Sequence, residues 1–143
     1  MTKNVLIVDD TISTVELFGE ILKLGGFNPL AAFNGLDALE IVRKQHVDCI
    51  ILDIMMPGID GISVCKSIKQ NPKTRDIPIA IITAYYDDLI ERRSFQAGAN
   101  AFLKKPIDHE NLLEVINELI EPKIKETVTI YRLPNSGIMI CNS

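Results

Sequence analysis

Short apolar runs alternate with longer amphipathic segments along most of the chain. The apolar runs lie at residues 5–8, 30–33, 49–54, 77–83 and 101–103. Most of these runs are apolar on both faces, which is typical of strands in a parallel sheet that helices cover on both sides. The runs therefore predict five buried strands.

Helical segments follow the predicted strands. Apolar positions recur at helical spacing in the segments 11–24, 36–44 and 109–120, and the segments 62–69 and 87–98 fit helices between the strands. The alternation predicts an α/β fold over residues 1–121, a doubly wound parallel sheet of five strands with five helices.

Residues 122–143 break this alternation and form a C-terminal extension. Residues 127–131 alternate like a strand, 134–137 have the composition of a turn, and 138–141 fit a return strand. The extension is interpreted as a β-hairpin or a disordered tail, or as the start of a longer regulator. A hairpin there could add to a sheet edge, cover a helix face or mediate a homodimer.

Composition and charge exclude several classes of protein. The chain has 143 residues, with 15 Lys and Arg against 19 Asp and Glu, a net charge of −4 that argues against direct binding of nucleic acid. No apolar run is long enough to span a membrane. Three widely spaced cysteines, Cys49, Cys65 and Cys141, favour neither a disulfide framework nor a zinc site, and indicate the reducing cytoplasm.

Polar residues interrupt the apolar pattern where the strands end. Asp9 and Asp10 end the first strand, Asp53 lies near the end of the third, Thr83 ends the fourth, and Lys105 closely follows the fifth. In open parallel sheets, ligands bind outside the carboxyl ends of the strands. For the order 2-1-3-4-5, three carboxylates therefore converge between the first and third strands.

Such a group of acids requires compensation. Two carboxylates about 5 Å apart repel by roughly 3 kcal/mol at an effective dielectric constant near 20, so either a pKa rises or a cation binds. Oxygen ligands at a partly open site suit Mg²⁺ (or Mn²⁺). With a carboxylate nucleophile, a lysine and a hydroxyl nearby, the set predicts phosphoryl transfer.

The ordered motifs VLIVDD, CIILDIMMPGIDG, IITA and AGANAFLKKP resemble a two-component response regulator receiver domain over residues 3–121, either stand-alone or truncated. The resemblance implies a flavodoxin-like fold with strand order 2-1-3-4-5. It implies that Asp53 is the phosphoacceptor and that Asp9, Asp10, Asp53 and the backbone carbonyl of Met55 hold the metal. The implied phosphoryl donor is a sensor histidine kinase or a phosphotransfer protein.

The same resemblance assigns roles around the phosphoryl group. It implies that Thr83 and Lys105 contact that group, that Thr83 and Phe102 form the conformational switch, and that the bond before Pro106 is cis. Phosphorylation then remodels a face for an effector protein, or for a homodimer.

One departure from the family concerns the path of attacking water. Met55 and Tyr85 stand two positions after Asp53 and Thr83, and neither side chain carries a carboxylate or amide that could orient water. We therefore expect slow loss of the phosphoryl group.

Three other functions compete with this interpretation. A Mg²⁺-dependent phosphatase usually has a DxD motif after the first strand, but here the two acids are adjacent. A flavin-binding module would need a Ser, Thr and Gly-rich loop, and VDDTIST is too acidic. The third alternative is a receiver that has lost its chemistry and serves only protein interaction.

Overall fold

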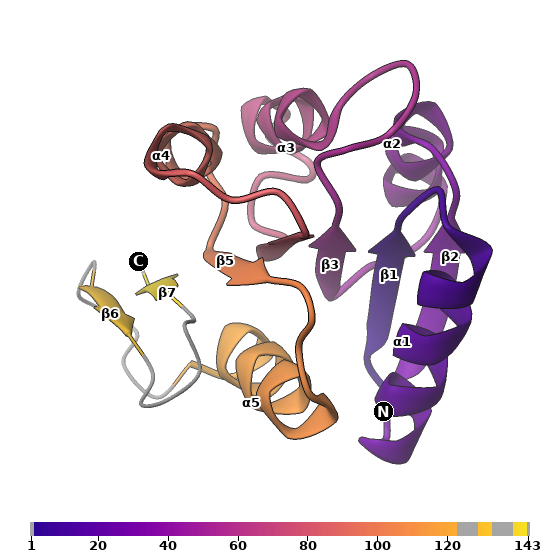
Figure 1. Ribbon diagram of the computed structural model, residues 1–143. Helices are drawn as coiled ribbons and strands as arrows, with labels where there is room; N and C mark the ends of the chain where they lie inside the picture. The colour runs from indigo at the N-terminus through magenta and orange to yellow at the C-terminus, as the bar shows by residue number, and fades with distance from the viewer. Residues whose placement is uncertain (1, 123–128, 133–138, 143) are drawn as a thin grey trace.

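The computed structural model describes residues 2–122, 129–132 and 139–142, with a sheet between two layers of helices (Figure 1). Five strands run parallel in the order β2-β1-β3-β4-β5. Their bounds are β1 Asn4–Val8, β2 Asn28–Ala32, β3 Cys49–Leu52, β4 Ile79–Thr83 and β5 Ala101–Lys104. The helices between and after them are α1 Ile12–Leu24, α2 Gly35–Lys44, α3 Gly61–Gln70, α4 Asp88–Gln96 and α5 His109–Ile120. The predicted flavodoxin-like order is confirmed.

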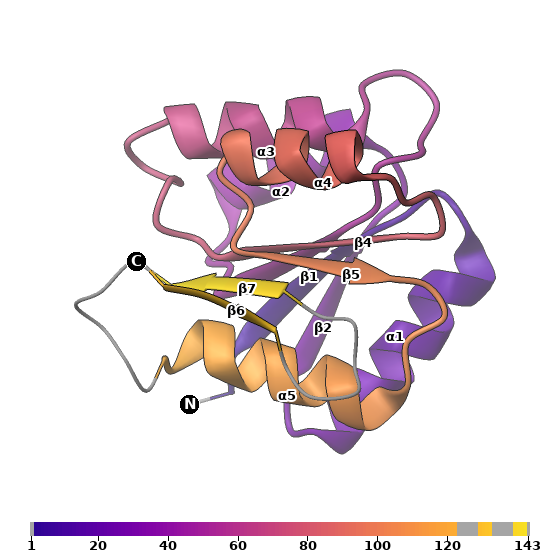
Figure 2. The same cartoon turned by 60° about the vertical axis from the view of Figure 1, so that its left-hand side comes forward.

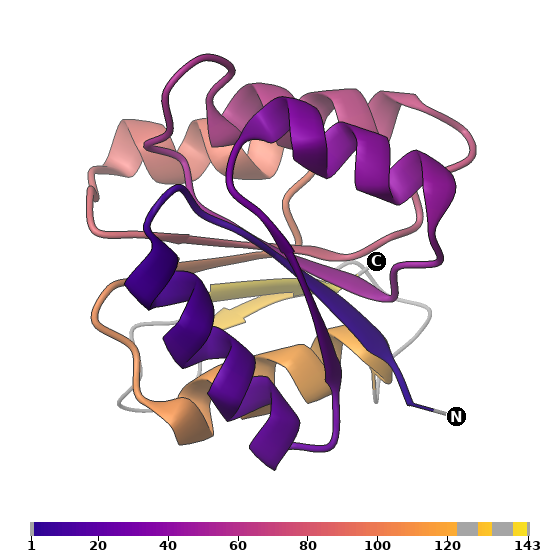
Figure 3. The ribbon, with the colours of Figure 1, turned by 90° about the vertical axis from the view of Figure 1, so that its right-hand side faces the viewer.

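Both faces of the parallel sheet are covered. Helices α1 and α5 lie on one face, and α2, α3 and α4 lie on the other (Figure 3). In β1, Val5 and Ile7 belong to the core beneath α1 and α5, whereas Leu6 and Val8 belong to the opposite core. Successive side chains of a strand point to opposite faces, so a strand buried on both sides is apolar at every position.

The sheet is larger than the sequence pattern predicted. Strands β6 Thr129–Arg132 and β7 Met139–Asn142 pair antiparallel, and β7 also pairs antiparallel with β5 (Figure 2). The predicted parallel sheet of five strands is confirmed, and the hairpin extends it to a sheet of seven strands, which is one of the arrangements that the sequence left open. In a sheet of five strands, the outer edge of β5 would carry unpaired backbone groups, and here the chain's own hairpin pairs with them.

Several strand boundaries differ from the expected ones, and two of these differences have a local cause. Strand β2 begins at Asn28 and includes Pro29, because an edge strand with one neighbour tolerates a missing N–H. Strand β4 begins at Ile79, because the Ile77 N–H donates to the Thr74 carbonyl in the preceding turn. Among the described residues, no helix has the length and apolar character needed to cross a bilayer.

Candidate phosphoryl-transfer site

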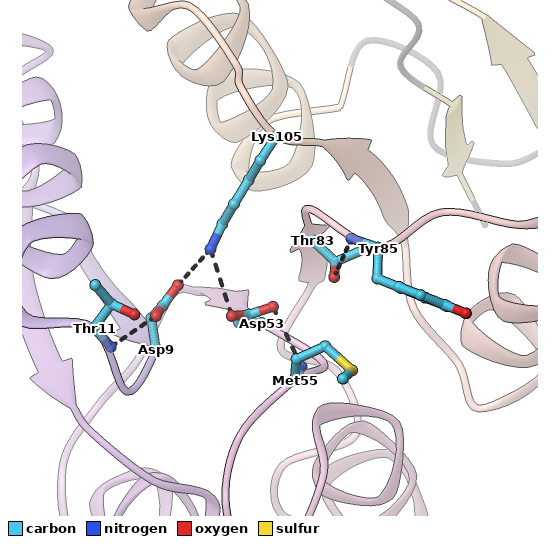
Figure 4. Close-up of polar contacts among 7 residues, drawn as sticks. All are labelled: Asp9, Thr11, Asp53, Met55, Thr83, Tyr85 and Lys105. Atoms are coloured by element: carbon cyan, nitrogen blue, oxygen red, sulfur yellow. Dashed lines mark hydrogen bonds and ion pairs between the residues drawn. The ribbon is translucent and has the colours of Figure 1, made fainter.

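Polar residues identified at the strand ends meet where the carboxyl ends of the strands lie side by side, and Figure 4 shows four of them, Asp9, Asp53, Thr83 and Lys105. Asp9 and Asp10 follow β1, Asp53 follows β3, Thr83 ends β4, and Lys105 follows β5. Parallel strands bring their carboxyl ends to the same edge, so residues far apart in the chain become neighbours.

The three acids form a compact cluster. One carboxylate oxygen from each of Asp9, Asp10 and Asp53 lies within 4.8 Å of the others. Asp9 and Asp53 are only 2% and 7% exposed, whereas Asp10 is exposed. The cluster thus has two buried carboxylates and one that faces solvent.

Lys105 compensates the two buried acids. Its Nζ donates to Asp9 Oδ2 at 2.8 Å and to Asp53 Oδ2 at 3.4 Å. Burial lowers the pKa of Lys105, but the hydrogen bond to Asp9 and the negative charge of Asp53 outweigh this effect, and the net pKa is raised. The lysine therefore stays charged and acts as a shared counter-ion.

The surroundings of Asp53 disfavour the charged form of its carboxyl. Burial raises the pKa of its carboxyl, the ammonium of Lys105 lowers it, the charge of Asp9 raises it again, and the net shift is upward. The Asp9 Oδ1 atom already accepts from the Thr11 N–H at 2.9 Å. Three hard oxygen donors at a site open through Asp10 fit Mg²⁺, which prefers such ligands and keeps several waters.

The loop after β3 holds Asp53 in place. The Met55 N–H donates to Asp53 Oδ1 at 3.4 Å, while the Met55 side chain is 60% exposed. The loop ends at α3, where the side chain of Asp60 accepts from the Ser63 N–H and caps the helix. At Gly61, a Cβ atom would overlap the Asp53 carbonyl, so the first residue of α3 lies directly against the site.

Thr83 and the peptide bond after Lys105 complete the candidate site at the carboxyl ends of the strands. Thr83 is fully buried, and its Oγ1 accepts from the Tyr85 N–H at 3.2 Å, which leaves the hydroxyl hydrogen available for donation. Figure 4 shows the Thr83 hydroxyl and the Lys105 ammonium pointing toward the region of Asp53. The Lys105–Pro106 peptide bond is cis.

Comparison with known proteins identifies the family. The family model for the response regulator receiver domain matches residues 5–117. This chain belongs to that family. The polar-differentiation response regulator DivK of Brucella ovis is 33% identical over 120 residues, which span 84% of this chain and 98% of DivK. The fold and the family together make this protein a receiver domain of two-component signalling.

Solved structures agree with this assignment. A crystal structure of a response regulator from Chloroflexus aurantiacus J-10-fl has a TM-score of 0.80 and 33% identity, covering 84% of this chain and 98% of that one. The Vibrio cholerae chemotaxis protein CheY4 has a TM-score of 0.79 and 28% identity, covering 83% and 99%. Because the chain belongs to this family, the receiver interpretation is preferred over a phosphatase or a flavin-binding module.

Phe102 lies apart from the acids of the receiver site. It is 2% exposed and packs in the core beneath α2, α3 and α4, with its ring centroid 5.8 Å from that of Tyr86. The Nζ of Lys104 lies 3.7 Å from the centroid of the Tyr86 ring, and the Tyr86 hydroxyl donates to Asp88 at 3.3 Å. Tyr86 thus joins the β4–α4 loop to β5.

Sequence reasoning missed Tyr86. An aromatic residue in a loop between a strand and a helix gives no local signal of its partner. Its contacts with Phe102 and Lys104 follow from the way this loop lies beside β5, which only the tertiary structure reveals.

Proposed function

We propose that this receiver domain accepts a phosphoryl group on Asp53 from a sensor histidine kinase or a phosphotransfer protein, in a reaction that depends on Mg²⁺ (or Mn²⁺). The observation that carries the proposal is the arrangement of Lys105 between Asp9 and Asp53 at the carboxyl ends of the strands. The buried carboxylate of Asp53, the cation that it shares with Asp9 and the exposed acid of Asp10 supply the nucleophile, the positive charge and the metal ligands that phosphoryl transfer needs.

In the proposed reaction, a carboxylate oxygen of Asp53 attacks the phosphorus of a phosphohistidine. A P–O bond to Asp53 forms as the P–N bond breaks, and the bonding pair leaves with the imidazole. Lys105 and the Thr83 hydroxyl donate to the phosphoryl oxygens. A bound Mg²⁺, held by Asp9, Asp10, Asp53 and the Met55 carbonyl, would supply positive charge to those oxygens.

The domain modifies only itself and turns over no metabolite. We propose that residues 1–121 form the receiver unit and residues 122–143 its extension, and that Thr83 and Phe102 carry the switch to an effector protein. A cytoplasmic location is supported by the thiols of Cys49 and Cys65, which are free and buried. Direct contact with nucleic acid is not part of the proposal.

Intact-mass spectrometry after incubation with acetyl phosphate tests the proposal. We expect one phosphoryl adduct, which requires Mg²⁺ and is lost in Asp53→Asn. Asp60→Asn is a matched control, because Asp60 is an exposed helix cap that Asn can replace. It should be phosphorylated like the wild type.

Two outcomes would contradict the proposal. An adduct that persists in Asp53→Asn would place the phosphoryl group elsewhere. Absence of any adduct, both with acetyl phosphate and with a phosphohistidine donor, would leave a receiver that serves only protein interaction.

A further inference from the structure

The hairpin formed by β6 and β7 closes an edge of the sheet that the receiver unit would otherwise leave open. Strand β7 pairs with β5 in a register that sets Ala101 opposite Ile140 and Phe102 opposite Met139 (Figure 2). The family match ends at residue 117, so both strands lie beyond the matched region. The hairpin is therefore an addition to the receiver unit.

The contact between β7 and β5 is short. It comprises the two register pairs at Ala101 and Phe102, whereas β1 and β2 share five pairs, Asn4↔Asn28 through Val8↔Ala32. Each backbone hydrogen bond adds little net stability, because an unpaired edge bonds to water instead. A ladder of this length can open while the parallel sheet stays folded.

Strand β5 connects this ladder directly to the candidate site. Its first two residues pair with β7, and its last residue, Lys104, pairs with Thr83 and precedes Lys105. The Lys105 N–H also donates to the Thr83 carbonyl at 2.9 Å. No loop separates the start of β5, which pairs with β7, from its end beside Thr83 and Lys105. A displacement of these two site residues therefore acts on the same strand, only a few residues from Phe102.

Phosphorylation would change the contacts of both site residues. The Lys105 ammonium is bonded to Asp9 and Asp53, and the new phosphoryl oxygens on Asp53 would compete for it and for the Thr83 hydroxyl. The hairpin pairs with β5 in its present position. A shift of β5 would lengthen the few hydrogen bonds to β7, and hydrogen bonds weaken steeply with loss of alignment.

We propose that the β6–β7 hairpin is an intramolecular cover of the β5 edge that phosphorylation of Asp53 releases. This inference rests on the proposed function. While docked, the hairpin denies the edge to any other strand, and once released it leaves the backbone groups of β5 unpaired. Linkage is reciprocal: if phosphorylation weakens the docking of the hairpin by a given factor, loss of docking favours the phosphorylated form by that same factor.

Hydrogen exchange of the full chain tests the cover. Ile140→Pro places a proline in β7 at a position that is paired on both sides, with Ala101 of β5 and Tyr131 of β6, where a proline disrupts the pairing. Ile140→Thr is the matched control, because it keeps the N–H and a β-branched side chain. In the absence of a phosphodonor, we expect the amides of β5 to exchange several-fold faster in Ile140→Pro than in the wild type or Ile140→Thr. Equal exchange in all three would overturn the docking.

The second arm adds acetyl phosphate and Mg²⁺ and monitors the adduct by intact mass. In the wild type, formation of the adduct should raise exchange in β5 and β7 to the level of Ile140→Pro, while Asp53→Asn should not respond. Ile140→Pro should also accumulate several-fold more adduct at limiting donor. An adduct without faster exchange, or with slower exchange, contradicts the release, whereas no adduct contradicts the proposed function and the release together.

Light scattering separates an intramolecular cover from a homodimer. We expect the wild type, Ile140→Pro and Ile140→Thr to have the mass of a monomer. A dimer in the wild type and Ile140→Thr that becomes a monomer in Ile140→Pro would mean that the hairpin pairs with a second copy, and it would overturn the proposal.

Discussion

At the scale of single residues, Lys105 decides how three acids can share one sheet edge. It contacts the two buried carboxylates of Asp9 and Asp53 and leaves the exposed Asp10 to solvent. Removing one partner of such an arrangement leaves an uncompensated buried charge, which is more costly than the pair itself is favourable. The lysine therefore supports the fold of the site as well as the proposed phosphoryl transfer.

Under the proposed function, we expect single residues to set the lifetime of the phosphoryl group as well. Met55 and Tyr85 are 60% and 55% exposed, so their side chains can change without disturbing the core. We expect the double variant Met55→Asn, Tyr85→Glu to lose its phosphoryl group several-fold faster, because an amide and a carboxylate can orient the attacking water. The decay of the adduct, followed by intact mass, measures this.

The control for this prediction is another exposed apolar residue. Leu24 is 81% exposed at the end of α1, so Leu24→Asn makes a similar apolar-to-polar change at a helix end. Its adduct should decay at the wild-type rate. If the double variant and Leu24→Asn decay alike, the expected role of the two positions is wrong.

The sequence alone was sufficient to identify site residues that are polar or charged at positions where the surrounding pattern is apolar. The charge of a carboxylate such as Asp53, which follows an apolar strand, must be balanced by another group, so the sequence alone marks this residue as part of a site. Tyr86 is not unusual in its local sequence, and its contact with Phe102 depends on how the β4–α4 loop lies beside β5. The pairing of Lys105 with both buried acids, rather than with one, likewise follows only from the tertiary structure.

At the scale of elements, the start of α3 is fitted against the end of β3. The Cβ of an alanine at position 61 would overlap backbone atoms of Asp53 and Ile54, which cannot move aside as a flexible side chain can. We expect Gly61→Ala to lower the free energy of unfolding by about 2 kcal/mol or more and to reduce phosphorylation. Urea denaturation measures the first effect and intact mass the second.

Gly58 supplies the comparison within the same loop. Its φ is +80°, and a Cβ there would meet no atom within 4 Å. Gly58→Ala should therefore show only the strain of a left-handed alanine, about 1 kcal/mol, and should be phosphorylated normally. Equal losses in the two variants would mean that the close approach at Gly61 is unimportant.

Element order was predictable, but the location of the hairpin was not. Local alternation indicates strands without naming their neighbours, and the parallel sheet offers two edges, β2 and β5. Pro29 in β2 has no N–H to donate, whereas no residue of β5 is a proline. This difference favours β5 as the edge that the hairpin joins, and it becomes evident only when the two edges are known.

At the scale of the whole molecule, metal binding at the acid cluster would stabilise the fold. A ligand that binds only the folded state raises the free energy of unfolding, by about 2.7 kcal/mol at one hundred times its dissociation constant. We expect the melting temperature to rise with the concentration of Mg²⁺. Asp10→Asn should weaken this response, because it removes the exposed oxygen ligand, and scanning calorimetry measures both.

Asp60→Asn again serves as the control, since it removes one acidic charge outside the cluster. Its response to Mg²⁺ should match that of the wild type. A response that is equally weak in Asp10→Asn and Asp60→Asn would reflect net charge rather than a site.

The contacts of Lys105 also bear on how the chain matures. The lysine lies 96 residues from Asp9 and 52 from Asp53 along the chain, so the site joins contacts of very long sequence separation. Such contacts form late, because closing long loops is entropically costly. A partly folded chain that lacks β5 holds its acids without their lysine. Under the proposed function such a chain would not accept the phosphoryl group, and phosphorylation would report that folding is complete.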